Sequence, residues 1–157
     1  MGIVSYVIEW SGGTPVTLAG TVTRYTPTAN LAEGAHTWRV TACDAGAQCT
    51  SSGWASFSVD LQAPTAPFLM APSPGEVVWE NPLYIFEWVP SYDAQHYVQY
   101  TVLIDDQEYA VPDSDSVLYL EAFLDYVEHT WFVRACDLAG NCADSPSQVF
   151  TIRPYIK

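Results

Sequence analysis

A stretch of fourteen residues in the first half of the chain recurs, little changed, in the second half. Residues 36–49 read HTWRVTACDAGAQC, and residues 129–142 read HTWFVRACDLAGNC. The offset of 93 residues continues beyond this stretch and pairs Phe57 with Phe150. A repeat of this length suits one β-domain of about 100 residues. The repeat therefore predicts two copies of one module.

The boundary between the copies is expected in the segment from Asp60 to Pro67. This segment holds two prolines and no periodic pattern, which is typical of a short and fairly stiff linker. We predict an incomplete module over residues 1–60, a linker over residues 61–66 and a complete module over residues 67–157.

The composition favours strands over helices. Hydrophobic residues make up 49% of the chain and aromatic residues 14%, which is enough apolar material for a packed core. No long segment keeps the apolar spacing of an amphipathic helix, and the nearest candidate, residues 118–125, is too short. The sequence therefore predicts an all-β protein.

Alternation of apolar residues predicts seven strands in the second copy. Residues on one face of each strand are expected to form its core. The expected strands begin with residues 68–71 and residues 83–89, and continue with those centred on Val102, on residues 108–111, on residues 117–120, on Val133 and on Phe150. Expected core residues are Tyr84, Phe86, Trp88, Tyr100, Val102, Ile104, Trp131, Val133, Ala135, Phe150 and Ile152.

The repeated segment resembles a known group of modules. Leu124, then the Trp-x-Val-x-Ala-x-Asp pattern from Trp131, the Ala-Gly-Asn turn ending at Asn141, and the later Ser145 and Phe150 are similar to the last strands of bacterial and archaeal fibronectin III-like and Ig-like repeats. The resemblance covers most of residues 67–154 and, from residue 6, the first copy. It implies tandem Ig-like/fibronectin-III-like antiparallel β-sandwiches, and it says almost nothing about function.

The first copy departs from this pattern because its first two strands have no counterpart. Five residues precede Tyr6, whereas more than thirty precede the equivalent Tyr100 in the second copy. An isolated half-sandwich would expose apolar surface and unpaired strand edges. Three explanations stay open: the sequence is a fragment, the second copy covers the surface, or another chain donates strands.

Four cysteines occupy equivalent places in the two copies. Cys43 and Cys49, and likewise Cys136 and Cys142, face each other across a predicted hairpin, within reach of a disulfide. A zinc site would need further ligands, and the nearest histidines stand about 20 Å away along the strand. We therefore predict two disulfides, which place the protein outside the cell or at the cell surface.

No catalytic motif is found in the sequence. His36 and His129 occupy the same position in both copies, which indicates a packing or hydrogen-bonding role, and His96 is expected to be solvated. No nucleophile elbow, phosphate loop or metal-binding histidine pair is present. We predict that the chain is not an enzyme and needs no cofactor.

Acidic residues in the loops raise the question of calcium. Asp44 and Asp137 begin the hairpin loops and are expected to cap them, with Gly46 and Gly140 supplying positive φ angles. The weak candidate ligands for Ca²⁺ are Asp105, Asp106, Glu108, Asp113 and Asp115. The favoured interpretation of these carboxylates is solvated loop charge.

Four aromatic residues fall outside the predicted core: Trp54, Trp79, Tyr92 and Tyr97. Exposed aromatic rings stack on sugars in carbohydrate-binding modules, so these are weak candidates for polysaccharide binding. Packing in the core or at its rim is the favoured interpretation.

Charge excludes some partners. The net charge is −13, so the chain lacks the basic surface that nucleic acids require, and no apolar run is long enough to insert in a membrane. The N-terminus lacks the features of a signal peptide, so we expect a mature form or an excised fragment.

The sequence therefore predicts a non-catalytic structural spacer or interaction module of a larger secreted or cell-surface protein. One alternative is a self-assembling surface or filament subunit completed by strand exchange between chains, and another is a carbohydrate-binding module. Expected partners are another protein or a second copy bound through the incomplete first module, and a polysaccharide.

Overall fold

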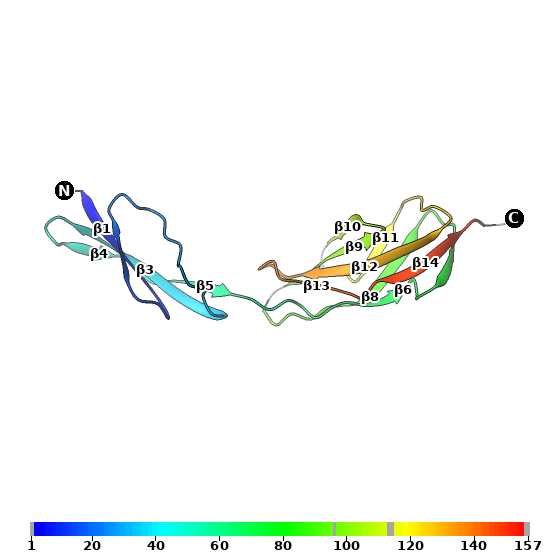
Figure 1. The fold of residues 1–157 in the computed structure, drawn as a ribbon, viewed down its shortest axis with the longest axis horizontal. Coiled ribbons are helices and arrows are strands. Elements are labelled where there is room, and N and C mark those ends of the chain that lie inside the picture. Colours follow the sequence, from blue (N-terminus) through cyan, green and yellow to red (C-terminus); the bar gives the residue numbers. More distant parts are fainter. Residues whose placement is uncertain (1, 96, 113–114, 156–157) are drawn as a thin grey trace. The chain divides into compact units, whose positions relative to one another are not determined.

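The computed structural model describes residues 2–95, 97–112 and 115–155. The chain divides into two compact units, unit 1 (Met1–Asp60) and unit 2 (Leu61–Lys157). All the regular elements are β-strands, as predicted, and most of them pair antiparallel (Figure 1). In the described part of the chain, no helix is long and apolar enough to cross a membrane.

Unit 1 forms one five-stranded sheet. Its strand order is β2-β1-β3-β4, and β5 pairs with the first half of β3. The strands are β1 (Ile3–Trp10), β2 (Val16–Ala19), β3 (Gly34–Asp44), β4 (Cys49–Ser51) and β5 (Ala55–Val59).

Unit 2 forms two sheets. One has the order β10-β9-β12-β14-β7 with β13 paired to β12, and the other has the order β11-β8-β6. The strands are β6 (Phe68–Ala71), β7 (Glu76–Trp79), β8 (Tyr84–Val89), β9 (Gln99–Ile104), β10 (Gln107–Val111), β11 (Val117–Leu120), β12 (Glu128–Cys136), β13 (Cys142–Asp144) and β14 (Gln148–Arg153).

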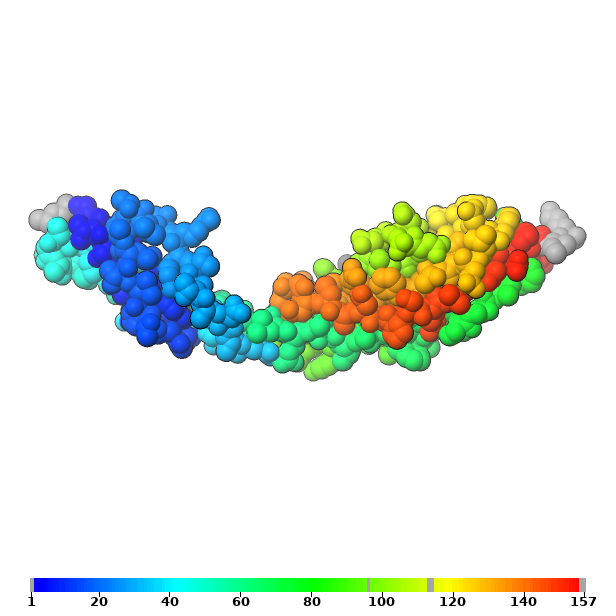
Figure 2. Space-filling model, viewed as in Figure 1, coloured from blue at the N-terminus to red at the C-terminus, as the bar shows by residue number. Residues whose placement is uncertain are grey.

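The core of unit 2 lies between its two sheets. The ring of Phe86 meets Trp131 edge-on with centroids 5.1 Å apart, and it meets Phe150 at 5.6 Å. Trp88 packs in the same way against Tyr100, at 5.3 Å. Alternate residues of β8, β9, β12 and β14 are buried, which confirms the core that the alternation predicted. In Figure 2 the green strands and the orange and red strands of this unit lie against one another.

Two short strands of unit 2 were not predicted. β13 extends the disulfide hairpin, and β7 pairs in parallel with β14, where Val78 lies opposite Ile152. β7 follows the turn at residues 72–75, and Gly75 takes a positive φ of 74° that reverses the chain. The residues of β7, Glu-Val-Val-Trp, do not alternate between polar and apolar, so no local pattern predicts this strand.

The two units share one strand register. In unit 1, β1 and β3 place Trp10 opposite Trp38, and in unit 2, β9 and β12 place Ile104 opposite Trp131. The sheet of unit 1 is therefore built like the sheet of unit 2 that contains β12. The second sheet has no counterpart among the described residues of unit 1, and every residue of the buried hydrophobic core belongs to unit 2.

Candidate functional site

One side of the sheet of unit 1 is an uncovered apolar surface, which we call the open face. It forms a trough of about 840 Å³. Its floor is made by alternate residues of β1, β3 and β5, which the period of two directs to one side of the sheet. These residues are Tyr6, Ile8, Trp10, Trp38, Val40 and Phe57.

The segment between β2 and β3 borders the open face. Val22, Arg24 and Tyr25 line the trough, and the Tyr25 ring packs on Trp10 with centroids 5.5 Å apart. Residues 22–27 form no strand, and in Figure 1 this blue segment loops beside the sheet without entering it. At the repeat offset of 93, residues 24–27 correspond to β11, a strand of the second sheet in unit 2.

Exposure at equivalent positions shows how much surface the open face leaves to solvent. Trp38 is 42% exposed, whereas its equivalent Trp131 is 0% exposed. Phe57 is 39% exposed, and its equivalent Phe150 is 0% exposed. Large apolar residues grouped in this way are unusual on a soluble surface and mark an interaction site.

The edge of the same sheet is also unpaired at β5. β5 pairs with β3 alone, whereas its equivalent β14 pairs with β12 and with β7. A free edge offers backbone N–H and C=O groups to an added strand. Among the described residues, unit 1 therefore lacks both a covering sheet and an edge strand.

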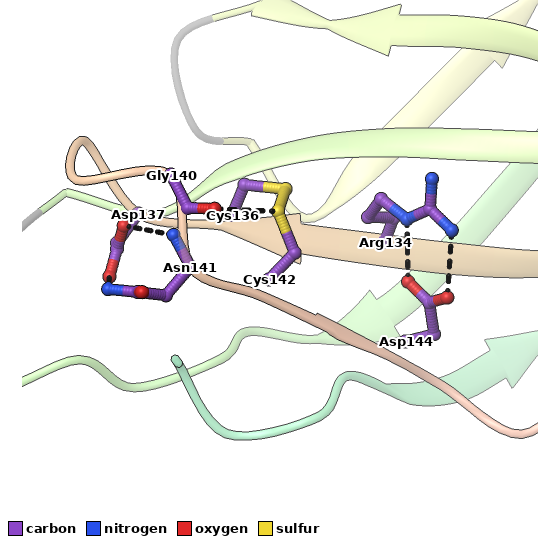
Figure 3. The surroundings of a disulfide bond; sticks show 7 residues. All are labelled: Arg134, Cys136, Asp137, Gly140, Asn141, Cys142 and Asp144. Carbon is purple, nitrogen blue, oxygen red and sulfur yellow. Dashed lines mark hydrogen bonds and ion pairs between the residues drawn. A yellow bond between two sulfur atoms is a disulfide. The ribbon is translucent and has the colours of Figure 1, made fainter. Parts of the chain in front are cut away.

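A disulfide closes the hairpin at the end of each sheet. Cys43 bonds to Cys49 and Cys136 to Cys142, and in each pair the two Cα atoms lie 4.1 Å apart. The paired strands put each cysteine opposite its partner in the register. Figure 3 shows the second disulfide between the two strands of its hairpin.

The hairpin loops are capped by aspartates, as expected. Asp137 accepts hydrogen bonds from the backbone N–H of Asn141 at 2.9 Å and from its side-chain amide at 2.8 Å (Figure 3). Asp44 accepts from the N–H groups of Gly46 and Gln48. Gly140 takes a positive φ of 94°.

The predicted positive φ at Gly46 is wrong. The residue with φ of 60° is Ala47. The loop of unit 1 therefore places its left-handed residue one position later than expected, where a Cβ adds strain. The loop of unit 1 reads Asp-Ala-Gly-Ala and that of unit 2 reads Asp-Leu-Ala-Gly, so Ala47 stands at the position equivalent to Gly140. The prediction followed the glycine and not the equivalent position.

Three carboxylates, two in the hairpin of unit 2 and one in β1, have shifted pKa values. Burial acts to raise the pKa of Asp137, but the hydrogen bonds from Asn141 and from the loop N–H groups outweigh it and lower the pKa. Arg134 hydrogen-bonds Asp144 through two nitrogens at 2.8 and 2.9 Å and lowers its pKa. Arg39 lowers the pKa of Glu9 through the same kind of contact. These groups act as structural links between strands.

The repeated histidines have repeated partners. The Nε2 atom of His36 lies 2.7 Å from the carbonyl oxygen of Ala32, and that of His129 lies 2.8 Å from the carbonyl oxygen of Asp125. The Nδ1 atom of His129 also lies 2.5 Å from a carboxylate oxygen of Asp105. Both rings stack on the equivalent phenylalanines, Phe57 and Phe150. His96 lies outside the described residues.

The weak calcium candidates that the structure describes do not gather into a site. Asp105 bonds His129 and the N–H of Thr130, and with Asp106 it forms the turn between β9 and β10, where both residues have positive φ. Glu108 and Asp115 are exposed, and Asp113 lies outside the described residues. Among the described members of this set, no three supply oxygen atoms within one cluster. In the same unit, Asp93 and Asp137, which were not predicted as ligands, bring carboxylate oxygens within 4.8 Å of each other.

The four aromatic candidates for sugar binding are all exposed. Trp54 lies under the guanidinium of Arg39, with 4.7 Å from the guanidinium carbon to the ring centroid. Trp79 packs edge-on against Tyr155 at 6.5 Å. Tyr92 and Tyr97 extend from the segment between β8 and β9. None of the four rings lies in the core, so the core half of the favoured interpretation is wrong, whereas packing at the rim stays a prediction.

Solved structures show which known fold the chain shares. The chain is similar to the fibronectin(III)-like modules of Clostridium thermocellum CbhA, with a TM-score of 0.65 and 13% identity over 98% of this chain and 80% of that chain. It is also similar to the FN1–FN3 domains of chicken CNTN1, with a TM-score of 0.56 and 16% identity over 95% of this chain and 55% of that chain. The protein therefore has a fibronectin III-like, all-β fold. No known protein family and no curated protein matches the chain.

Proposed function

We propose that the chain is a non-catalytic module of a larger secreted or cell-surface protein, and that unit 1 is its interaction unit. Unit 2 acts as a self-contained structural unit. The open face of unit 1 binds protein. The observation that carries this proposal is the exposure of Trp38 and Phe57 at positions whose equivalents are fully buried in unit 2.

The hairpins and the fold support an extracellular location. Both disulfides are exposed at least on one side, where thiols in a reducing compartment would not stay paired. Fibronectin III-like modules are the fold neighbours of the chain.

The bonding of the polar groups supports a role without catalysis. His36 and His129 each fix a loop carbonyl oxygen and stack on a phenylalanine. Asp137 caps a hairpin, and Asp144 ties two strands through Arg134. Each of these groups has a structural task.

An apolar dye tests whether the open face is available in solution. We expect the folded chain to bind 8-anilinonaphthalene-1-sulfonate, which reports exposed apolar surface. Phe57→Glu places a charge in the trough and should remove this binding, whereas Tyr119→Glu, on an exposed position of β11, should leave it unchanged. A folded chain that neither binds the dye nor associates with itself would leave a spacer role as the function.

Self-assembly is a second candidate, which the free edge of β5 favours. Edge strands pair with the edges of other chains, and β5 lacks the parallel partner that β14 has. Light scattering over a range of concentrations measures this directly. Assembly predicts a mass that rises to a dimer or beyond and that Phe57→Glu returns to the monomer. A constant monomer mass excludes assembly and leaves binding to other proteins.

A further inference from the structure

We propose that the open face accepts an extended segment of a second polypeptide with an aromatic–acidic–aromatic pattern. This inference rests on the proposed function of unit 1 as an interaction unit and names its ligand. The segment would lie on unit 1 as β8 lies on unit 2. Its acidic residue would face Arg24.

Unit 2 shows which side chains cover this kind of sheet. Phe86 of β8 contacts both Trp131 and Phe150, and Trp88, two residues later, contacts Tyr100. One strand with aromatic residues at alternate positions therefore covers three aromatic rings of the facing sheet. All these rings become almost wholly buried as a result.

Unit 1 presents the same three rings without the covering strand. The equivalents of Trp131, Phe150 and Tyr100 are Trp38, Phe57 and Tyr6, and all three line the trough. Because the register of β1 with β3 matches that of β9 with β12, the rings keep the same relative positions in the sheet. A ligand with aromatic residues two positions apart therefore meets Trp38 and Phe57 with the first ring and Tyr6 with the second.

The backbone of such a ligand also has a partner in unit 1. In unit 2, β8 pairs antiparallel with β11. The equivalent residues 24–27 of unit 1 border the trough without forming a strand, and Tyr25 and Pro27 line it at the positions equivalent to the buried Leu118 and Leu120. An incoming strand can pair with this segment as β8 pairs with β11.

The charge of Arg24 favours an acidic residue between the two aromatic side chains of the ligand. In unit 2, Glu87 lies between Phe86 and Trp88 and is opposite Val117 in the register. The residue equivalent to Val117 in unit 1 is Arg24. Within the described part of the chain, Arg24 forms no ion pair, whereas Arg39 and Arg134 each pair with a carboxylate. A carboxylate at the Glu87 position of a ligand would lie opposite this guanidinium.

A peptide that copies residues 83–89 of this chain, Leu-Tyr-Ile-Phe-Glu-Trp-Val, is a direct probe. We would label it with a fluorophore on a short soluble tail and titrate it with the whole chain, 1–157, by fluorescence anisotropy. The control peptide exchanges Phe86 and Glu87, which keeps the composition and breaks the alternation. We expect the control to bind at least about tenfold more weakly.

Variants of the chain test the site. Trp38→Ala should weaken binding by about 30-fold or more, because it removes a central aromatic contact, whereas Trp54→Ala, outside the trough, should not change it. Val22→Lys gives a second test that does not touch the sheet, since residue 22 is in no strand. It should weaken binding while leaving the circular dichroism spectrum unchanged.

Charge reversal tests the predicted pairing. The peptide with Glu87→Lys should bind the natural chain more weakly, and Arg24→Glu in the chain should restore its binding. A variant that had merely lost its fold would not bind the reversed peptide better. Equal binding of the ordered and exchanged peptides, or no restoration by charge reversal, would overturn the inference.

The outcomes separate this inference from the proposed function. If the chain binds the dye and neither peptide, the open face is an interaction surface with another ligand. If the chain forms a dimer that Phe57→Glu disrupts and that excludes the peptide, the occupant is a second copy. If the chain binds neither dye nor peptide and stays monomeric, the proposed function and the inference both fail.

Discussion

Ser52 and Ser145 make the same contact in the two units in different surroundings. The N–H of Val40 donates to the hydroxyl of Ser52 at 3.0 Å, and the N–H of Val133 donates to that of Ser145 at the same distance. Each serine N–H in turn donates to the carbonyl oxygen of the same valine. Ser145 is buried, whereas Ser52 is exposed. Because the two serines bond their valines in the same way, these two contacts differ in burial. Comparing them therefore shows how much more stability is lost when a buried N–H has no acceptor than when water can replace the hydroxyl.

We predict that Ser145→Ala lowers the free energy of unfolding of unit 2 by about 1–3 kcal/mol, because a buried N–H loses its acceptor. The matched Ser52→Ala should cost less than about 1 kcal/mol, because water replaces the hydroxyl. Urea denaturation of the two variants measures both values. Equal costs would mean that burial does not set the value of this contact.

Asp137 gives unit 2 a dependence on pH at the acid end. Its pKa in the folded protein lies below the ordinary value of 3.8. The stabilisation from its charged form is therefore complete above about pH 4 and is lost as the pH falls through the lower, folded pKa. We predict that Asp137→Asn is less stable than the natural chain at pH 7 and that the difference shrinks below pH 3.8. Urea denaturation from pH 7 to pH 2 measures this, and a constant difference would contradict it.

At the scale of single residues, the sequence predicted which positions have a structural role but not which distant residues they contact. The recurrence of His36 and His129 indicated a shared structural role, and both bond a loop carbonyl oxygen four residues earlier. The contact between His129 and Asp105 joins residues 24 positions apart, and its counterpart in unit 1 uses Ser11. Because the acid is replaced by a hydroxyl in the other copy, comparison of the copies did not reveal it.

Among the elements, β8 places aromatic side chains in the core of unit 2. Three of its six residues are buried aromatic side chains, and Phe86 lies at the centre of the cluster. We predict that Phe86→Ala costs about 3–5 kcal/mol, because it leaves a cavity between the sheets. The neighbouring Ile85 faces solvent, and Ile85→Ala should cost less than about 1 kcal/mol. Thermal or urea unfolding distinguishes the two, and similar losses would contradict the assigned faces.

Each disulfide stabilises a short hairpin, so its contribution is modest. The sequence separation between the bonded cysteines is six residues in both units. Closing a loop of this size lowers the entropy of the unfolded chain by an amount worth about 2 kcal/mol. We predict that replacing Cys136 and Cys142 together with alanine costs about this much in urea denaturation and leaves the sheet order intact. A loss of the whole unit 2 fold would show a larger role.

Strands with a clear pattern were predictable even when short, as the four-residue β6 and β11 show, but two short strands were not. β3 and β12 are the longest strands of their units. Alternation identified β12 in the sequence, and the repeat of residues 36–49 and 129–142 extended the pattern to β3. β7 and β13 have four and three residues, and they form because a partner strand is already in place. Such strands depend on tertiary contacts, which a local pattern cannot show.

At the scale of the whole molecule, only unit 2 has a closed core among the described residues, so we expect the two units to differ in stability. All of the fully buried hydrophobic residues belong to unit 2. We predict that amides of β3 exchange with deuterium at least about tenfold faster than the equivalent amides of β12. Hydrogen exchange measured by mass spectrometry or NMR tests this for matched positions such as Val40 and Val133. Equal protection would show that the open face is covered in solution.

The open face was the part of the candidate site that the sequence predicted best. Missing strand equivalents indicated an uncovered sheet, and the exposure of Trp38 agrees with it. The border formed by residues 22–27 was not foreseen, because the segment has neither strand alternation nor a turn motif. Its position depends on packing against Trp10, which joins residues distant in the sequence.

The parallel pairing of β7 with β14 has a mechanical consequence. β7 lies near the start of unit 2 and β14 at its end, and four register pairs join them, from Phe150 with Glu76 to Arg153 with Trp79. Tension applied to the two ends of the unit pulls these parallel strands in opposite directions, so their hydrogen bonds are sheared together instead of being broken one at a time. We therefore expect unit 2 to resist stretching along the chain better than unit 1, where β5 has no such partner among the described residues.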